Sequence, residues 1–154
     1  MIEDEVFGKL TFDYTWFRYE KIIFCGEEKD ILILVAGEED GKFDEGQYEA
    51  YRMLKSKWVK MQEGILESIL DYYKNKRKEL GYDEEWNEAY TEIVTTKDLL
   101  NYIILVSIKI PYADIYGGRS IGLSFDCTWD DENGLGIQLC DEHVVEVGYQ
   151  DIGI

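Results

Sequence analysis

The sequence predicts an α+β fold in which a mostly antiparallel sheet, an N-terminal three-strand meander plus C-terminal strands, packs against one long amphipathic helix. Three observations support this prediction: strand-like stretches up to residue 35, apolar residues at helical spacing from Tyr48 to Tyr72, and short apolar runs between polar turns after residue 102. The 154 residues match the size of one domain, and no linker or repeat divides them. We therefore expect a single domain over residues 1–154.

The first 35 residues indicate three strands. Residues 6–13 alternate in part between apolar and polar side chains, and residues 16–24 are rich in aromatic and β-branched side chains. The polar residues 26–30 predict a turn. The apolar run 31–35 is short and continuous enough to be a central strand.

The long helix has a well-marked start. Asp44 is a typical N-cap, Gln47 follows three residues later, and Phe43 is placed to pack on Tyr48. We expect the helix to run to residue 80, where Gly81 ends it, and Gly64 indicates a kink or the close approach of another backbone. The apolar face of this helix is predicted to hold Tyr48, Tyr51, Leu54, Trp58, Met61, Ile65, Ile69 and Tyr72.

The rest of the chain returns to strands. Residues 82–92 indicate a weaker helical turn or lid with Trp86 as its anchor, and Thr95 caps one or two further helical turns. Residues 102–110 predict a buried strand that ends before Pro111, the one proline. A hairpin follows, with strands at 121–129 and 135–140 around a turn at 130–134, and a last strand covers 143–147.

The end of the chain is unusually acidic. Residues 120–154 hold eight Asp and Glu residues and no Lys or Arg. Because apolar residues are interleaved with them throughout, these carboxylates are expected to lie on folded strands and not on a disordered tail.

The charge of the whole chain limits its partners. The formal net charge is −17, from 33 acidic and 16 basic residues. Nucleic-acid binding depends on Lys and Arg, so no nucleic-acid partner is expected, and anionic lipid surfaces would be repelled. A basic protein or a cation would be attracted, while the alternative is that the acidity serves solubility alone.

The sequence predicts a cytoplasmic protein with no membrane partner. The first five residues are acidic where a secretory signal would be basic, and no apolar run approaches the roughly 20 residues of a membrane span. Three single cysteines without a C-x-x-C pair suit a reducing compartment.

The carboxylates Asp126, Asp130, Asp131 and Glu132 form a dense acidic group in the C-terminal part of the chain. Their spacing does not fit the twelve-residue calcium loop, and neighbouring turn residues give no evidence of an acid and base pair. A solvated hairpin turn, with Asn133 and Gly134 supplying positive φ, is the simpler interpretation. Trp129 beside this turn is either an interface anchor or a core residue.

Other catalytic patterns are weak. His143 is the one histidine, and Cys140, three residues earlier on a predicted strand, is expected to point to the opposite face. No glycine-rich phosphate loop is present, and no cofactor is predicted.

The C-terminal part resembles an uncharacterised bacterial family of about this length. The resemblance rests on FDCTWD at 125–130, GLG at 134–136 and VEVG at 145–148, which are similar to a Trp-Asp motif followed by a Gly-x-Gly hairpin. This chain has Asn133 where the motif would have His. The family has no assigned activity, but similar small acidic proteins are associated with bacterial toxin and immunity neighbourhoods, so the resemblance implies an immunity-like role.

Our leading hypothesis is a non-enzymatic interaction protein, in one form an immunity-like neutraliser, that binds a basic partner such as a toxin domain. Two alternatives stay open: a metal- or carboxylate-dependent enzyme using residues 126–132, and a structural or oligomer-forming module. The partner-binding surface is predicted to consist of Trp129, Asp130, Asp131, Glu132, Asn133, Asp141 and Glu142.

Overall fold

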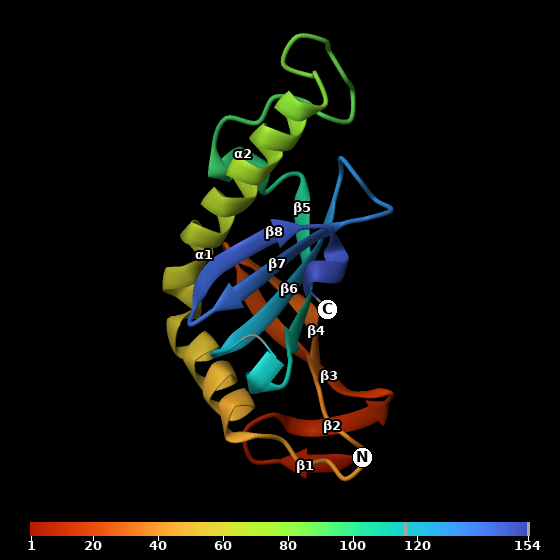
Figure 1. Cartoon of the computed structure of the whole chain (residues 1–154), viewed down its shortest axis with the longest axis vertical. Coiled ribbons are helices and arrows are strands. Elements are labelled where there is room, and N and C mark those ends of the chain that lie inside the picture. Colours follow the sequence, from red (N-terminus) through yellow and green to blue (C-terminus); the bar gives the residue numbers. More distant parts are fainter. Residues whose placement is uncertain (116, 154) are drawn as a thin grey trace.

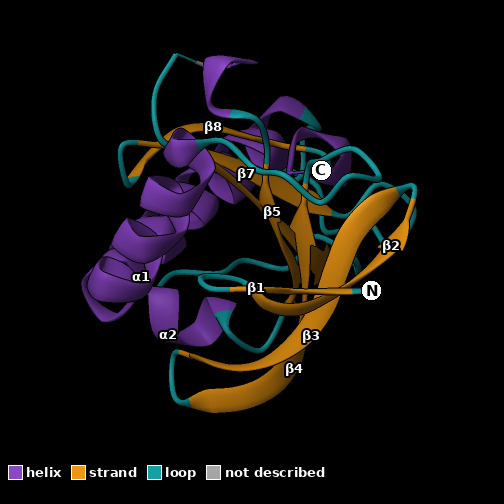
Figure 2. Ribbon diagram, turned by 90° about the horizontal axis from the view of Figure 1, so that it is seen from below, coloured by secondary structure: helices purple, strands orange, loops and turns teal. Residues whose placement is uncertain are grey.

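The computed structural model describes residues 1–115 and 117–153 and shows one curved sheet with a long helix along its concave side (Figures 1 and 2). The strands are paired in chain order, β1 to β8, and every pair is antiparallel except β4 with β5. The predicted α+β class and the mostly antiparallel sheet are confirmed. The elements are β1 (Ile2–Asp4), β2 (Gly8–Asp13), β3 (Thr15–Phe24), β4 (Glu27–Val35), α1 (Glu45–Glu79), α2 (Thr96–Leu99), β5 (Ile103–Ile110), η1 (Ala113–Ile115), β6 (Ser120–Cys127), β7 (Leu135–Cys140), β8 (His143–Gly148) and η2 (Gln150–Gly153).

The predicted start and end of α1 are confirmed. The Asp44 carboxylate accepts a hydrogen bond from the Gln47 N–H at 2.7 Å, and the Gln47 side chain accepts one from the Asp44 N–H at 3.0 Å. The rings of Phe43 and Tyr48 meet edge to face. Gly81, with φ of +83°, follows the C-cap residue Leu80. Local sequence therefore defines this helix at both ends.

The N-terminal region differs from the prediction in two ways. A short additional strand, β1, pairs with β2, so the meander has four strands. The predicted turn at 26–30 is wrong, because the turn is made by Cys25 and Gly26, both with positive φ, and β4 already begins at Glu27. Two-residue turns with two positive φ values match the twist of a hairpin, so the polar residues that follow are free to extend the strand.

Two details expected for the helical region are not found: Trp86 as an anchor, and another backbone close to Gly64. A single turn, closed by the Glu85 N–H donating to the Gly81 carbonyl at 3.1 Å, begins the 82–92 segment, and the rest is irregular. The side chain of Trp86 is 82% exposed, so it does not anchor the segment. Gly64 is exposed, and no heavy atom of the described residues lies within 4 Å of the position that a Cβ would take there, so of the two alternatives for this glycine the close approach of another backbone is excluded.

The core lies between the sheet and α1. The concave face presents Ile31 and Ile33 from β4 and Leu123 and Phe125 from β6, all almost fully buried, to Ile65 and Ile69 of the helix in the same hydrophobic cluster. No described helix combines the length and apolar character needed to cross a membrane.

The C-terminal segment covers part of the opposite, convex face. Tyr149 and the η2 turn lie directly against β6 and β7, where Gly122 and Gly136 have no side chain to hold them away. A Cβ on Gly136 would lie 2.2 Å from the carbonyl oxygen of Tyr149, and one on Gly122 would lie 2.4 Å from that of Gly153. The second glycine of the Gly-x-Gly motif is therefore needed for backbone packing.

Candidate functional site

The predicted acidic turn is a tight, internally bonded structure between β6 and β7. The Asp130 carboxylate accepts hydrogen bonds from the backbone N–H and the side-chain amide of Asn133, at 3.1 and 2.9 Å. Gly134 has φ of +62°, and its N–H donates to the Asp130 carbonyl at 2.9 Å. Asp130 and Asn133 thus build the turn, while Asp131 and Glu132 extend into solvent.

The Trp129 side chain packs between this turn and α1. Its side chain is only 7% exposed, and its ring centroid lies 4.5 Å from that of Tyr73 on α1. The Tyr73 hydroxyl donates a hydrogen bond to the Thr91 carbonyl, and its ring stacks on that of Tyr90. Of the two interpretations of Trp129, the structure favours the core residue, which fixes the turn against the end of α1.

Three further tyrosines surround the turn. Burial raises the pKa of Tyr90, and the nearby Asp130 carboxylate raises it further. The pKa of Tyr72 is raised by burial first and then by Tyr149, Tyr90 and Asp130 among its neighbours. The Gln150 N–H donates to the Asn133 carbonyl at 2.8 Å, which places Tyr149 beside the turn. We define the tip surface as Tyr72, Tyr90, Asp130, Asp131, Glu132, Asn133 and Tyr149.

Two basic residues at this end of α1, Lys76 and Arg77, already have partners within the fold. The Lys76 ammonium lies 5.3 Å from the centroid of the Tyr149 ring. Arg77 forms an ion pair with Asp83, and its Nε–H donates to the Tyr90 carbonyl at 2.8 Å. Among the ion pairs of the described residues, none involves Asp131 or Glu132. Their carboxylates are therefore available to an external cation.

The other two predicted residues, Asp141 and Glu142, lie at the opposite end of β7 (Figure 1). They form a two-residue turn with positive φ at both positions. Arg119 forms a two-point pair with the Glu142 carboxylate, at 2.8 and 3.0 Å, and Lys57 approaches it to 3.5 Å. The seven predicted residues thus form two separate groups, and in the second group the Glu142 carboxylate is already occupied within the chain.

The Arg119–Glu142 pair predicts a pH-dependent contribution to stability. The hydrogen bonds from Arg119 lower the pKa of Glu142 from its usual 4.5, against the opposing effect of burial, and Lys57 adds to the lowering. A carboxylate with a lowered native pKa stabilises the fold above its unfolded pKa, and this contribution is lost as the pH falls through the native value. We expect Glu142→Gln to reduce the free energy of unfolding by roughly 1–2 kcal/mol at pH 7.

Denaturant unfolding of the wild type and of Glu142→Gln from pH 7 downward measures this contribution. The difference between the two proteins should shrink once the pH is below about 4.5. Glu146→Gln is the control, because Glu146 is exposed on β8 without an ion pair among the described residues. A difference for Glu142→Gln that stays constant down to acid pH would contradict the assignment.

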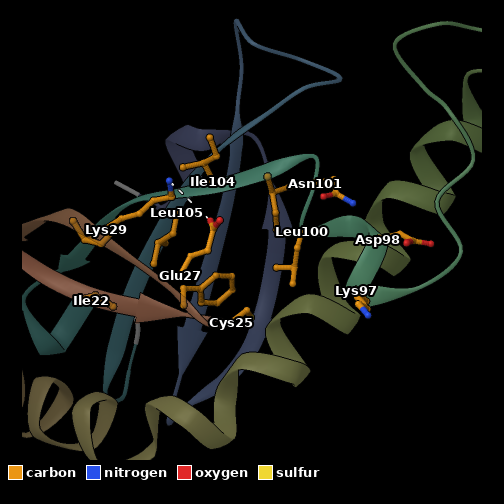
Figure 3. Close-up of a pocket in the computed structure, with 13 residues that line it drawn as sticks. Ile22, Cys25, Glu27, Lys29, Lys97, Asp98, Leu100, Asn101, Ile104 and Leu105 are labelled. Carbon is orange, nitrogen blue, oxygen red and sulfur yellow. Dashed lines mark ion pairs between the residues drawn. The ribbon is translucent and has the colours of Figure 1, made fainter.

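A cleft opens between β4 and β5 on the concave side of the sheet (Figure 3). Its volume is about 340 Å³, and Phe24, Ile31, Ile103 and Leu105 form an apolar floor. Figure 3 shows Glu27 and Lys29 on one side, joined by an ion pair of 4.0 Å, and Leu100 and Asn101 on the other. No sequence pattern indicated this cleft, because it depends on where the pairing of β4 with β5 begins.

Groups that could serve metal or thiol chemistry do not converge. Within residues 1–115 and 117–153, no three His, Cys, Asp or Glu side chains are grouped as metal ligands. Cys140 and His143 were expected to point to opposite faces, but they are paired directly across the β7–β8 turn. No hydrogen bond joins the two side chains in the described structure, and Cys140 is a free, half-buried thiol.

The fold and the tip surface define an α+β protein with an acidic, tyrosine-lined end and a separate apolar cleft. Residues 6–154 match the model of a family described as a domain of unknown function, DUF6985, and the chain belongs to this family. The match agrees with the resemblance to an uncharacterised family. Comparison with curated proteins found no match, and neither did comparison with solved structures.

Proposed function

We propose that this protein is a non-enzymatic interaction protein that binds a basic protein partner through the tip surface. The observation that carries the proposal is the pair of exposed carboxylates, Asp131 and Glu132, held on a rigid turn beside half-buried tyrosines. A cytoplasmic, bacterial, immunity-like neutraliser of a toxin domain is the form of this function that we favour.

Electrostatics supports a basic partner. The chain carries a net charge of −17, and no Lys or Arg follows Arg119. The electrostatic field of such a protein speeds its encounter with a positively charged partner and orients that partner during the approach. Because Asp131 and Glu132 form no ion pair among the described residues, a Lys or Arg of the partner would gain an attraction without displacing an existing pair.

The tyrosines of the tip surface add apolar contact area, which carboxylates alone do not provide. Tyrosine combines a large apolar ring with a hydroxyl and loses little conformational entropy on binding, which is why it is enriched in interfaces. Tyr72 and Tyr90 are already fixed by their neighbours in the fold, and Tyr149 is 43% exposed. The tip surface thus offers preorganised aromatic contacts next to free negative charge.

We expect the double variant Asp131→Lys/Glu132→Lys to lose the partner that the wild type retains from a lysate of its native host. The matched control is Glu38→Lys/Glu39→Lys, which makes the same change in net charge at two exposed residues between β4 and α1. Asp130 is left unchanged, because its carboxylate holds the turn. The bound protein is identified by mass spectrometry, and its affinity for the three proteins is then measured by calorimetry.

The expected result is a basic partner whose affinity falls at least tenfold with the tip variant and much less with the control, with the loss enlarged at low salt. Equal losses with both variants would mean that only net charge matters. If Asp131→Lys/Glu132→Lys binds the partner as tightly as the wild type does, the partner binds a surface other than the tip surface.

A further inference from the structure

The sheet is split at one end between β4 and β5. The pairing of these strands covers only Leu32 to Val35 on β4 and Ser107 to Ile110 on β5. On β4, residues 27–31 pair with β3, but no described strand lies on their other side. The same holds on β5 for residues 103–105, which pair only with β6, and for Val106, which lies at a register shift between the pairs made by Leu105 and Ser107. Two open strand edges thus face each other across the cleft of Figure 3.

Open edges of this kind are sites for strand addition. In a strand, every second residue directs its N–H and C=O toward a given neighbour, so each open edge presents unpaired donors and acceptors. An extended peptide that enters the cleft could pair with these groups, in the way that peptides add to exposed sheet edges in other proteins. The volume of about 340 Å³ leaves room for a few residues of such a peptide.

The two faces of the cleft differ in chemistry. Toward the concave side lie the buried side chains of Phe24, Ile31, Ile103 and Leu105. Toward the convex side, the alternation of the strands places the exposed Glu28 and Asp30 of β4 and the exposed Asp126 of β6, which is paired with Ile104. Of these carboxylates only Asp30 has a basic neighbour, Lys21, at 3.9 Å between two exposed side chains.

We propose that the β4–β5 cleft binds an extended segment of a partner protein in which apolar and basic residues alternate. The apolar side chains pack on the floor, the basic ones face Glu28 and Asp126, and the backbone pairs with residues 103–106 of β5. This inference rests on the proposed function only in taking the partner to be basic, because the cleft and the tip surface share no residue.

The test uses a fluorescently labelled six-residue peptide in which valine and lysine alternate, with blocked termini. We expect saturable binding by anisotropy, and slower amide hydrogen exchange at residues 103–106 in the peptide-bound protein. Two control peptides separate the contributions: one with glutamate in place of lysine, and one with N-methyl groups on alternate amides, which removes backbone donors. Each should bind at least tenfold more weakly than the parent peptide.

Variants of the protein complete the test. Glu28→Lys/Asp126→Lys should weaken the lysine peptide at least fivefold, whereas Asp131→Lys/Glu132→Lys should leave its affinity unchanged. Peptide binding without any change in exchange at residues 103–106 would overturn the proposal, as would equal binding of the N-methylated peptide. Protection of these residues that grows with protein concentration alone would assign the cleft to a second copy of the chain and would equally overturn it.

The outcomes distinguish this inference from the proposed function. If the host partner depends on the tip residues but the lysine peptide does not bind, the cleft proposal fails alone. If the peptide binds, and the host partner binds Asp131→Lys/Glu132→Lys as tightly as the wild type, the proposed function of the tip surface fails and the cleft proposal stands.

Discussion

Gly136→Ala is expected to reduce the free energy of unfolding by roughly 3 kcal/mol, because overpacking against a fixed backbone is among the costlier substitutions. The new Cβ would lie 2.2 Å from the Tyr149 carbonyl oxygen and 2.9 Å from the Gly153 nitrogen. Both are backbone atoms, so no side-chain rotation can relieve the contact. The segment from Tyr149 onward must move away from β7, and the hydrogen bond from the Gln150 N–H to the Asn133 carbonyl moves with it.

Gly64→Ala is the matched control for this substitution. Gly64 lies on the exposed face of α1, and no heavy atom of the described residues lies within 4 Å of the added Cβ, so alanine should stabilise the helix by about 0.5–1 kcal/mol. Urea unfolding of the three proteins measures both effects, which should have opposite signs. A Gly136→Ala protein as stable as the wild type would show that the C-terminal segment does not rest on the sheet.

Trp129→Ala is expected to cost about 3–5 kcal/mol, the range for removing a large aromatic side chain from a core. Its ring fills the space between Tyr73 and the β6–β7 turn, and the Cys127 thiol donates to the Asp130 carbonyl at 3.5 Å just beside it. Loss of the ring leaves a cavity under the turn. Because Tyr73 also stacks on Tyr90, we expect the 82–92 segment to loosen as well.

Trp86→Ala removes the same side chain from a position that is 82% exposed, and it should change stability by no more than about 0.5 kcal/mol. Thermal unfolding compares the two variants, and tryptophan fluorescence of Trp86→Ala reports on the remaining rings. Similar small effects for both substitutions would mean that Trp129 is not a core residue, and the interface-anchor interpretation would then regain support.

Features set by neighbouring residues were predicted well from the sequence. The capping box of Asp44 and Gln47 and the stop at Gly81 are local, and the structure has both. Gln47 also has a role that no local pattern shows. Its buried amide donates to the carbonyls of Ala36 and Ile110, at 2.8 and 3.2 Å, and so joins the start of α1 to the ends of β4 and β5.

Features set by strand register were not predicted. The cleft exists because β4 starts to pair with β5 only at Leu32, a fact about two segments more than 60 residues apart in the chain. The acidic surface was predicted as one patch, but β7 separates its two turns by the length of a strand. The tyrosines of the tip surface come from α1, from the 82–92 segment and from the C-terminal segment, so only the fold brings them to Asp130.

Amide hydrogen exchange of the complex with the basic partner from the host tests the central claim most directly. The account predicts slower exchange in the complex at residues 130–133 and 149–151, with no change at the Asp141–Glu142 turn, where Arg119 already holds the Glu142 carboxylate. Protection confined to other parts of the chain, with the β6–β7 turn exchanging as fast as in the free protein, would contradict it.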